Sequence, residues 1–265
     1  MTADEALAHL ARARRLLIAL DFDGTLSPLE NDPMAARMLP AARAAVTALT
    51  SLPCTWVALV SGRSLSDLRV IAEHHDDSPI LLAGSHGAEY WTPSAGVMEP
   101  DDDPADIVLR DRLRAAAEDA VRGLPGVFIE PKTFGFGVHT RRASEEDARA
   151  AGDAVDAIVA AGAPNWRRRT GHNIVEYAFR DEGKDTAVAH LRDLTEADTV
   201  LFAGDDVTDE DALRSLRSGD VGVHVGTGQA TAATVVVADI PAFAQFLAEL
   251  ADSRSREGGI DCDHA

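Results

Sequence analysis

Short apolar runs alternate with stretches of helical periodicity along most of the chain. Residues 16–20, LLIAL, and residues 55–60, TWVALV, are continuous apolar runs of strand length. Such runs are typical of strands buried on both faces of a sheet. Strands that alternate with helices favour an open parallel sheet, so the pattern predicts a doubly wound, Rossmann-like α/β core. The same reasoning predicts further strands at 79–83, 197–204, 220–226 and 234–239, and helices at 4–15, 41–52, 64–72, 185–194, 209–217 and 241–250.

The middle of the chain has a different order of elements. A helix, two strands that are expected to pair as a hairpin, a second helix and one further strand are predicted there. This order indicates a small α+β domain inserted into the doubly wound core. These elements are predicted at 107–122, 126–132, 134–143, 144–161 and 173–179.

The domain boundaries follow from these patterns. The core is expected at 1–104 and 183–250, and the inserted α+β cap domain at 105–182. Residues 251–265 lack apolar periodicity, so we expect a disordered tail.

Composition excludes several classes of protein. Apolar residues make up 46% of the chain and charged residues 26%, which fits a folded globular protein rather than a fibrous or disordered one. We expect neither a membrane span nor a secretory signal, because the longest apolar runs are strand-sized and the N-terminal residues lack an apolar segment. Cys54 and Cys262 lie far apart in the sequence, so we expect no disulfide framework and a cytoplasmic location.

The charge balance limits the choice of partners. The formal net charge is −19, and a surface of that sign repels nucleic acid. An anionic substrate would need positive charges placed locally. Lys132 and Lys184 are the two lysines in a chain whose other Lys and Arg residues are all arginine. Either they survived by chance, or a compact ammonium is needed at both positions.

Candidate catalytic groups lie where predicted strands end and helices begin. Asp21 and Asp23 follow the first strand, Ser61 follows the second, Lys184 precedes a helix and Asp205 follows a later strand. In doubly wound sheets these positions meet in one crevice, where ligands bind. Clustered carboxylates repel one another unless a cation lies among them, and a few hard oxygen ligands favour Mg²⁺. We therefore expect a magnesium site held by Asp21, Asp23 and Asp205.

These residue types are suited to phosphoryl transfer. Asp21 can attack phosphorus to form an aspartyl-phosphate. Residues two apart in extended chain point the same way, so Asp23 can protonate the leaving oxygen and then activate water. Ser61 would donate a hydrogen bond to a phosphoryl oxygen, and Lys184 would neutralise the charge that develops there.

Each residue also has a plainer interpretation. The two aspartates after the first strand could simply cap a loop, and Ser61 could be an ordinary turn serine. The acidic run after Asp205 could be a solvated helix start. Within it we take Asp206 and Asp209 as alternate or supporting metal groups, and Glu210 and Asp211 as capping residues.

Four motifs together resemble those of the haloacid-dehalogenase-like phosphatases. They are DFDGT at 21–25, SGR at 61–63, the isolated Lys184 and GDDVTDED at 204–211, in the family's order. The resemblance covers about 16–104 and 183–250. Such proteins carry a cap domain between the second and third motifs, which matches the α+β insert.

A closer resemblance is to the trehalose-6-phosphate phosphatases. It rests on DFDGTLSPL, GSHGAEYW at 84–91, GDDVTDEDAL and the pattern Lys132…His139-Thr140-Arg141. Thr140 stands where the family usually has tyrosine, and Asp185 where it has glycine. His86 and His139 could also be ordinary structural histidines. The resemblance implies that substrate is bound by Gly24, Thr25, Gly62, Arg63, His86 and Gly87 in the core and by Lys132, His139, Arg141 and Glu176 in the cap domain.

The resemblance implies a Mg²⁺-dependent phosphatase that converts trehalose 6-phosphate to trehalose and phosphate. A phosphatase for sucrose 6-phosphate or a glycosyl-3-phosphoglycerate would keep the same core chemistry, and so would a sugar-phosphate mutase. A non-catalytic sugar-phosphate sensor is a further alternative. A trehalose-phosphate synthase of the same pathway is the partner protein that we consider, and the sequence does not define an oligomeric state.

Overall fold

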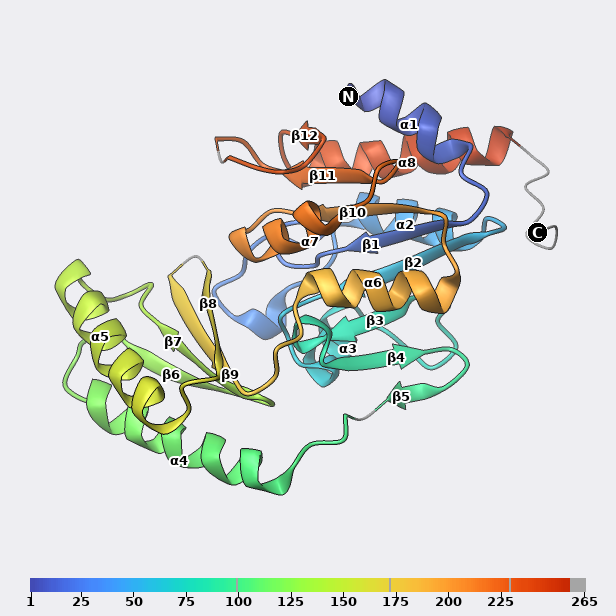
Figure 1. The fold of residues 1–265 in the computed structure, drawn as a ribbon. Coiled ribbons are helices and arrows are strands. Elements are labelled where there is room, and N and C mark those ends of the chain that lie inside the picture. The colour runs from blue at the N-terminus through green and yellow to red at the C-terminus, as the bar shows by residue number, and fades with distance from the viewer. Residues whose placement is uncertain (99, 172, 229, 258–265) are drawn as a thin grey trace. The chain divides into compact units, whose positions relative to one another are not determined.

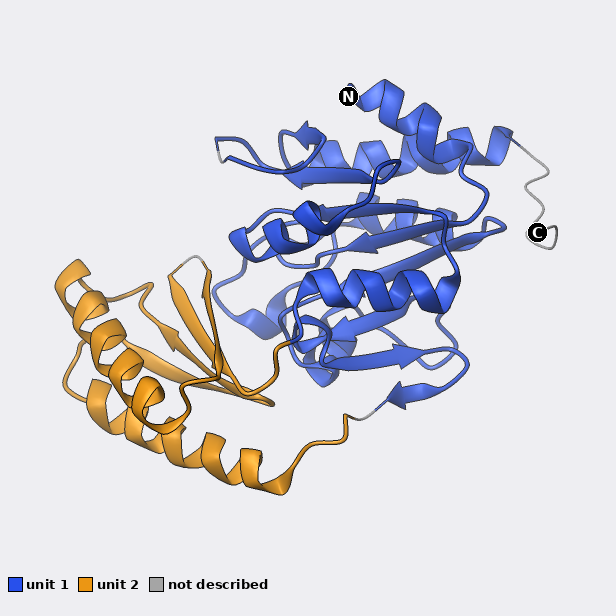
Figure 2. Cartoon of the chain, viewed as in Figure 1, with its two compact units in different colours: residues 1–99, 182–265 blue, residues 100–181 orange. Residues whose placement is uncertain are grey.

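The computed structural model describes residues 1–98, 100–171, 173–228 and 230–257 of the chain. The chain forms two compact units (Figure 2): unit 1 comprises residues 1–99 and 182–265, and unit 2 comprises residues 100–181. Each unit has its own sheet and its own apolar core. None of the described helices is long and apolar enough to cross a lipid bilayer.

Unit 1 is built around an eight-stranded sheet. Five of its seven strand pairs are parallel, and the two pairs at one edge are antiparallel. The spatial order (Figure 1) is β12 (Val235–Val237), β11 (Val221–Val225), β10 (Thr199–Gly204), β1 (Leu16–Leu20), β2 (Thr55–Val60), β3 (Leu81–Gly84), β4 (Glu89–Thr92) and β5 (Gly96–Met98).

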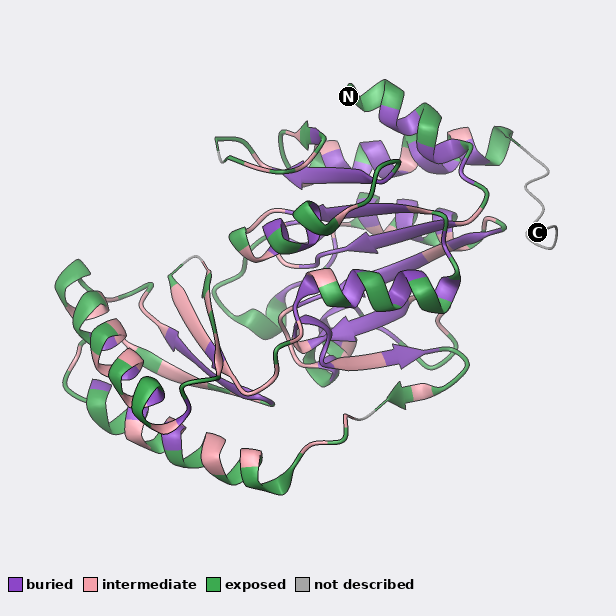
Figure 3. Ribbon diagram, viewed as in Figure 1, coloured by how far each residue is buried: buried purple, intermediate pink, exposed green. Residues whose placement is uncertain are grey.

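Helices cover both faces of this sheet. Alternate residues of β1 enter opposite cores: Ile18 packs into one and Leu17 and Ala19 into the other. Both cores are fully buried (Figure 3), which confirms the predicted doubly wound α/β fold. The first core is closed by α1 (Ala3–Ala11), α2 (Pro40–Thr50), α3 (Leu65–Ile71) and α8 (Ile240–Arg256), and the second by α6 (Lys184–Thr195) and α7 (Glu210–Ser215).

Unit 2 is an α+β unit with an antiparallel sheet. Its helices are α4 (Pro104–Val121) and α5 (Glu145–Gly162), whose apolar residues pack on one face of the sheet. Phe136, Val138 and Tyr177 form the sheet's side of this core. The strand order is β6 (Phe128–Lys132), β7 (Gly135–His139), β9 (Ile174–Ala178) and β8 (Arg167–Gly171).

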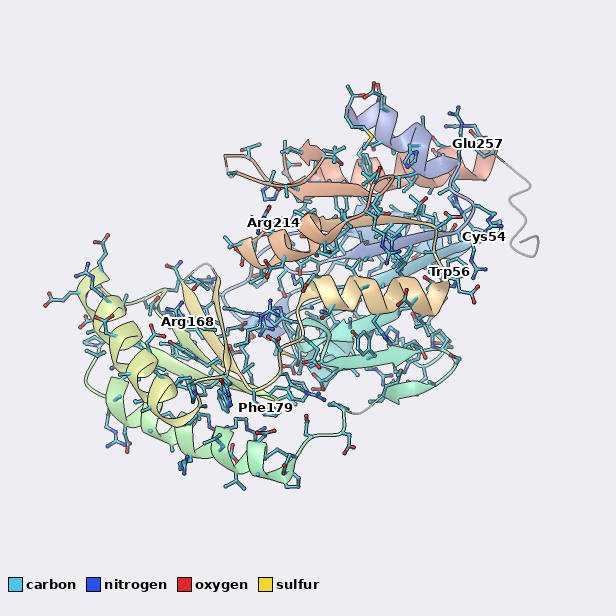
Figure 4. The ribbon with its side chains drawn as sticks, viewed as in Figure 1. Cys54, Trp56, Arg168, Phe179, Arg214 and Glu257 are labelled. Atoms are coloured by element: carbon cyan, nitrogen blue, oxygen red, sulfur yellow. The ribbon has the colours of Figure 1, made fainter. Side chains whose placement is uncertain are left out.

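The arginine run at 167–169 could be interpreted from the sequence either as a strand edge or as a surface patch, because the sequence of β8, RRRTG, contains no apolar residue. Its middle arginine, Arg168 (labelled in Figure 4), points to the helical face, where its Nε donates to the carboxylate of Asp156 at 2.7 Å. The hydroxyl of Tyr177 donates to the same carboxylate at 2.7 Å. The arginine run is therefore an edge strand that is held by polar contacts.

Two expectations about the end of the chain need correction. Helix α8 continues to Arg256, so residues 251–256 are helical rather than disordered; residues 258–265 lie outside the described part. The helix continues because Arg254 is buried and its guanidinium donates to the Ala13 carbonyl at 2.6 Å.

The second correction concerns cysteine. Cys54 (Figure 4) is disulfide-bonded, and Cys262 lies outside the described residues. Within the described residues, the last turns of α8 lie beside Cys54, because Arg254 donates to the Cys54 carbonyl at 2.9 Å. The cysteine argument for a cytoplasmic location is therefore lost.

Candidate active site

Neighbouring strands of unit 1 bring the predicted strand-end residues together. The N–H of Asp21 donates to the Ala203 carbonyl on β10 at 2.9 Å, which extends the β1–β10 ladder by one residue. The N–H of Ser61 donates to the Ala83 carbonyl on β3 at 2.9 Å. Because these strands are parallel, Asp21, Ser61 and the residues after β10 all leave the sheet at the same edge.

Lys184, the first residue of α6, bridges two carboxylates at this edge. Its Nζ donates to Oδ1 of Asp21 and to Oδ1 of Asp209, each at 2.6 Å. The side chain is 4% exposed. Burial by itself lowers a lysine pKa, but the charges of Asp209 and Asp21 outweigh burial and raise the pKa of Lys184, so it stays an ammonium.

Three carboxylates form the group that could hold a metal ion. One oxygen from each of Asp21, Asp205 and Asp209 lies within 4.8 Å of the others. The Thr25 hydroxyl lies 3.1 Å from Asp21 Oδ2 and 3.3 Å from Asp205 Oδ1. The N–H groups of Asp205 and Asp206 donate to Asp209 Oδ2 at 3.2 and 3.0 Å, so the loop is wrapped around that side chain.

These carboxylates carry more negative charge than Lys184 neutralises. Burial raises the pKa of Asp21 well above its ordinary value, and the charges of Asp209 and Asp205 raise it further. Burial and the charge of Asp209 raise the pKa of Asp205 to about 7. One divalent cation among the three oxygens would remove this repulsion, and hard oxygen ligands suit Mg²⁺.

Gly24 allows the loop after β1 to approach Asp205. Its φ is +85°, and a Cβ at this position would lie 2.0 Å from Asp205 Oδ2. A side chain is therefore excluded both by conformation and by space. The predicted substrate residues Gly24 and Thr25 thus lie beside the carboxylate group.

The carboxylate of Asp23 forms a two-bond contact with Arg63. Both of its oxygens accept hydrogen bonds from Arg63, from Nε at 2.6 Å and from Nη2 at 2.7 Å. The carboxylates that converge on Asp21 include Asp209, which we had predicted as an alternate or supporting metal group. The role of Asp23 as a metal ligand stays a prediction.

Ser61, Gly62, His86 and Gly87 occupy two loops that are hydrogen-bonded to each other. The N–H of His86 donates to the Ser61 carbonyl at 2.9 Å. His86 is buried and has a left-handed φ of 59°. A Cβ on Gly62 would lie 2.7 Å from its ring, so the glycine leaves room for the imidazole. A strained, buried histidine at a strand end is consistent with a role in the site.

Polar residues gather on the face of the unit 2 sheet opposite its helices. Lys132 Nζ lies 2.7 Å from Glu176 Oε1 and 3.2 Å from Glu130 Oε2. His139 Nε2 lies 2.7 Å from the same Glu130 oxygen. Strand register explains the cluster: Glu130, Gly137 and Glu176 stand opposite one another on β6, β7 and β9, with Lys132 two residues along. Arg141 lies beyond the end of β7 and is exposed.

Charges within this cluster support one another. Burial alone would lower the pKa of Lys132, but the charges of Glu176 and Glu130 raise it. Burial alone would raise the pKa of Glu130, yet the hydrogen bond from His139 and the charge of Lys132 lower it. Glu130 was missed in the sequence, although the alternation of Phe128, Glu130 and Lys132 could have placed it on this face.

The architecture and the site define a class first. A doubly wound core with carboxylates at adjoining strand ends and an inserted α+β unit is the fold of haloacid-dehalogenase-like proteins. A Bacillus subtilis structure described as a haloacid dehalogenase-like hydrolase matches with a TM-score of 0.58 and 14% identity, over 87% of this chain and 98% of that one.

Sequence comparisons identify the family within this class. A model of the trehalose-phosphatase family matches residues 19–240, and the chain belongs to that family. A trehalose-phosphate phosphatase of Mycolicibacterium paratuberculosis is 36% identical over 260 residues, which cover 93% of this chain. The C-terminal domain of the Candida albicans trehalose-6-phosphate phosphatase shares the fold, with a TM-score of 0.80 and 21% identity over 94% of this chain and 96% of that one. The matched region spans 64% of the mycobacterial relative's length.

Proposed function

We propose that this protein is a phosphatase that hydrolyses trehalose 6-phosphate to trehalose and phosphate. The observation that carries the proposal is the buried ammonium of Lys184 between Asp21 and Asp209, in a chain of the trehalose-phosphatase family. This arrangement presents a carboxylate nucleophile beside a fixed positive charge, which is what phosphoryl transfer to an enzyme side chain requires.

The first step transfers the phosphoryl group to the protein. An oxygen of the Asp21 carboxylate attacks phosphorus and the bond to the sugar oxygen breaks. The Asp23 carboxyl gives its proton to that oxygen, so trehalose leaves as the neutral alcohol and Asp23 becomes a carboxylate. Ser61 accepts the Arg63 N–H at 3.2 Å, and its own O–H can donate to a phosphoryl oxygen while Lys184 offsets the developing charge.

The second step releases phosphate. The Asp23 carboxylate takes a proton from water while the water oxygen attacks the phosphorus of the aspartyl-phosphate. The bond to the Asp21 oxygen breaks, which restores the Asp21 carboxylate and the protonated Asp23. Inorganic phosphate leaves, and the chain is ready for another cycle.

A magnesium ion fits the carboxylate group. Asp21, Asp205 and Asp209 would hold it, because their oxygens converge and one ammonium leaves them short of positive charge. When bound, such an ion lowers the repulsion between the carboxylates and the phosphoryl group and stabilises the transition-state charge.

The polar face of the unit 2 sheet is proposed to select the sugar. Lys132, Glu130, Glu176 and His139 offer fixed donors and acceptors of both charges, as hydroxyl groups of a sugar require. These contacts distinguish sugars, whereas the carboxylates and Lys184 of unit 1 act on any phosphate ester.

The test is phosphate release from a panel of sugar phosphates, with and without Mg²⁺. The panel contains trehalose 6-phosphate, sucrose 6-phosphate, glucose 6-phosphate and glucosyl-3-phosphoglycerate. We expect preference for trehalose 6-phosphate, with loss of activity in EDTA and in Asp21→Asn. Preference for another sugar would overturn the substrate but keep the chemistry. Binding without hydrolysis would favour a sugar-phosphate sensor.

A further inference from the structure

The side chains of Arg63 and Asp23 form a paired, two-bond contact, and Asp23 lies two residues after the proposed nucleophile, Asp21. Arg63 Nε and Nη2 donate to the two different oxygens of Asp23, at 2.6 and 2.7 Å. Such forked pairs are among the strongest and most strictly oriented hydrogen bonds in proteins. The side chains are 19% and 25% exposed, so an incoming ligand can reach both.

The backbone of Arg63 is held by hydrogen bonds to two neighbouring residues of the site. The N–H of Arg63 donates to Ser61 Oγ at 3.2 Å, and its carbonyl accepts the N–H of Ser85 at 2.6 Å. The loop after β2 is therefore tied to the loop after β3. The guanidinium extends from this fixed point to Asp23, forty positions earlier in the sequence.

This contact fixes the orientation of the Asp23 carboxyl group. An acid must hold a proton on one carboxyl oxygen and present it to the leaving oxygen. Each oxygen of Asp23 accepts one N–H from Arg63, and because a carboxylate has about four lone-pair sites, each oxygen keeps a site that can carry a proton. The two hydrogen bonds therefore determine the direction in which Asp23 can present that proton.

We propose that Arg63 is a positioning residue that acts on the reaction through Asp23, an inference that rests on the proposed phosphatase function. The two hydrogen bonds hold the plane of the Asp23 carboxyl group, so its remaining lone pairs keep one direction. A partner that lacks the planar fork would let the carboxyl group rotate, and its proton would face the leaving oxygen less often.

The test uses a series of alkyl and aryl phosphates whose leaving groups differ in pKa. An alkoxide needs a proton in order to leave, whereas p-nitrophenolate leaves without one. The slope of log kcat/KM against leaving-group pKa therefore measures protonation by Asp23, and Asp23→Asn should make it steeper. Measurements compare the wild type with Asp23→Asn, Arg63→Gln and Arg63→Lys, with saturating Mg²⁺ present.

If Arg63 acts through Asp23, Arg63→Gln should steepen the slope as Asp23→Asn does. We expect kcat/KM to fall by about tenfold or more for alkyl phosphates, which is part of the usual effect of a general acid. The fall in kcat/KM for p-nitrophenyl phosphate should be smaller. Arg63→Lys, which keeps the charge without the fork, should also steepen the slope. The double variant Arg63→Gln, Asp23→Asn should have nearly the same kcat/KM as Asp23→Asn alone, because both changes affect the same protonation step.

Other outcomes would overturn the inference. If Arg63 only binds phosphate, the line for Arg63→Gln would be lowered in parallel with the wild type. If the pair is only structural, the slope would be unchanged and the melting temperature would fall. Arg69→Gln is the matched control, because Arg69 is an ion-paired arginine of unit 1 outside the site. A wild type that is inactive toward every ester would refute the proposed function, whereas an active wild type with parallel lines would refute only the role of Arg63.

Discussion

The guanidinium of Arg254 joins three segments of unit 1, and its loss should lower the free energy of unfolding measurably. Arg254 is 3% exposed. It donates to the Ala13 carbonyl at 2.6 Å, to the Thr55 hydroxyl at 2.6 Å and to the Cys54 carbonyl at 2.9 Å. Longer contacts of 3.3 Å reach the carbonyls of Leu10 and Ala11. The end of α8 is thereby fixed to the chain after α1 and to the start of β2.

The magnitude follows from the groups that would lose a partner in Arg254→Met. The carbonyls of Leu10 and Cys54 keep a backbone partner, because they also accept N–H groups. The carbonyls of Ala11 and Ala13 lose the hydrogen bond from Arg254. Each loss should lower the free energy of unfolding by about 1–3 kcal/mol. Burial lowers the pKa of Arg254, which means that burying its charge is unfavourable, and removing the charge offsets part of this cost. We expect the free energy of unfolding to fall by about 3 kcal/mol in total.

The assay is thermal and urea-induced unfolding of the whole chain. A loss of about 3 kcal/mol corresponds to a fall in Tm of about 6–12 °C for a chain of this size. Arg256→Met is the matched control, because Arg256 lies on the same helix and is exposed. If Arg254→Met and Arg256→Met unfold within about 1 °C of each other, the assignment of Arg254 as a structural anchor is refuted.

Three further predictions concern the site. Lys184→Arg should lower kcat by about a hundredfold or more without unfolding the protein, because a planar guanidinium cannot replace a buried ammonium that bridges Asp21 and Asp209; kinetics with circular dichroism as control would show it. Lys132→Met should raise KM for the sugar phosphate by about tenfold, and affect p-nitrophenyl phosphate less, since that ester has no sugar; equal losses would contradict the role of unit 2. Affinity for Mg²⁺ should rise between about pH 6 and 8, because Asp205, whose pKa is raised to about 7, must lose its proton to bind the metal. Calorimetry in buffers of different ionisation enthalpy should detect that proton, and a pH-independent affinity would contradict the raised pKa.

The core of unit 1 could be predicted because its strands are buried on both faces. A run such as LLIAL at Leu16–Leu20 has few alternatives to a buried strand, and the strand-end rule then places Asp21. Two of the four edge strands, β5 and β8, gave no such signal, whereas the edge strands β12 and β6 were predicted. β5 is only three residues long and carries exposed Val97 and Met98, and β8 is rich in arginine.

Contacts between distant loops could not be predicted from the sequence. Arg63 was expected to touch substrate and Asp23 to hold a metal and to act as acid and base, and those roles stay predictions. The two-bond contact between them was not predicted, because it joins loops that are forty positions apart in the sequence. Residue type and position indicate candidate site residues, whereas their partners depend on loop conformation.

The two lysines of this arginine-rich chain share one geometric feature. Lys184 bridges the carboxylates of Asp21 and Asp209, and Lys132 bridges those of Glu130 and Glu176. Arg63, by contrast, uses two donors of its planar fork on the two oxygens of Asp23. A compact ammonium with three donors can instead hold two carboxylates that approach from different directions. The geometry therefore favours a requirement for lysine at both positions over chance survival, since a larger, planar guanidinium directs its donors differently and would not reproduce both short contacts that each ammonium makes.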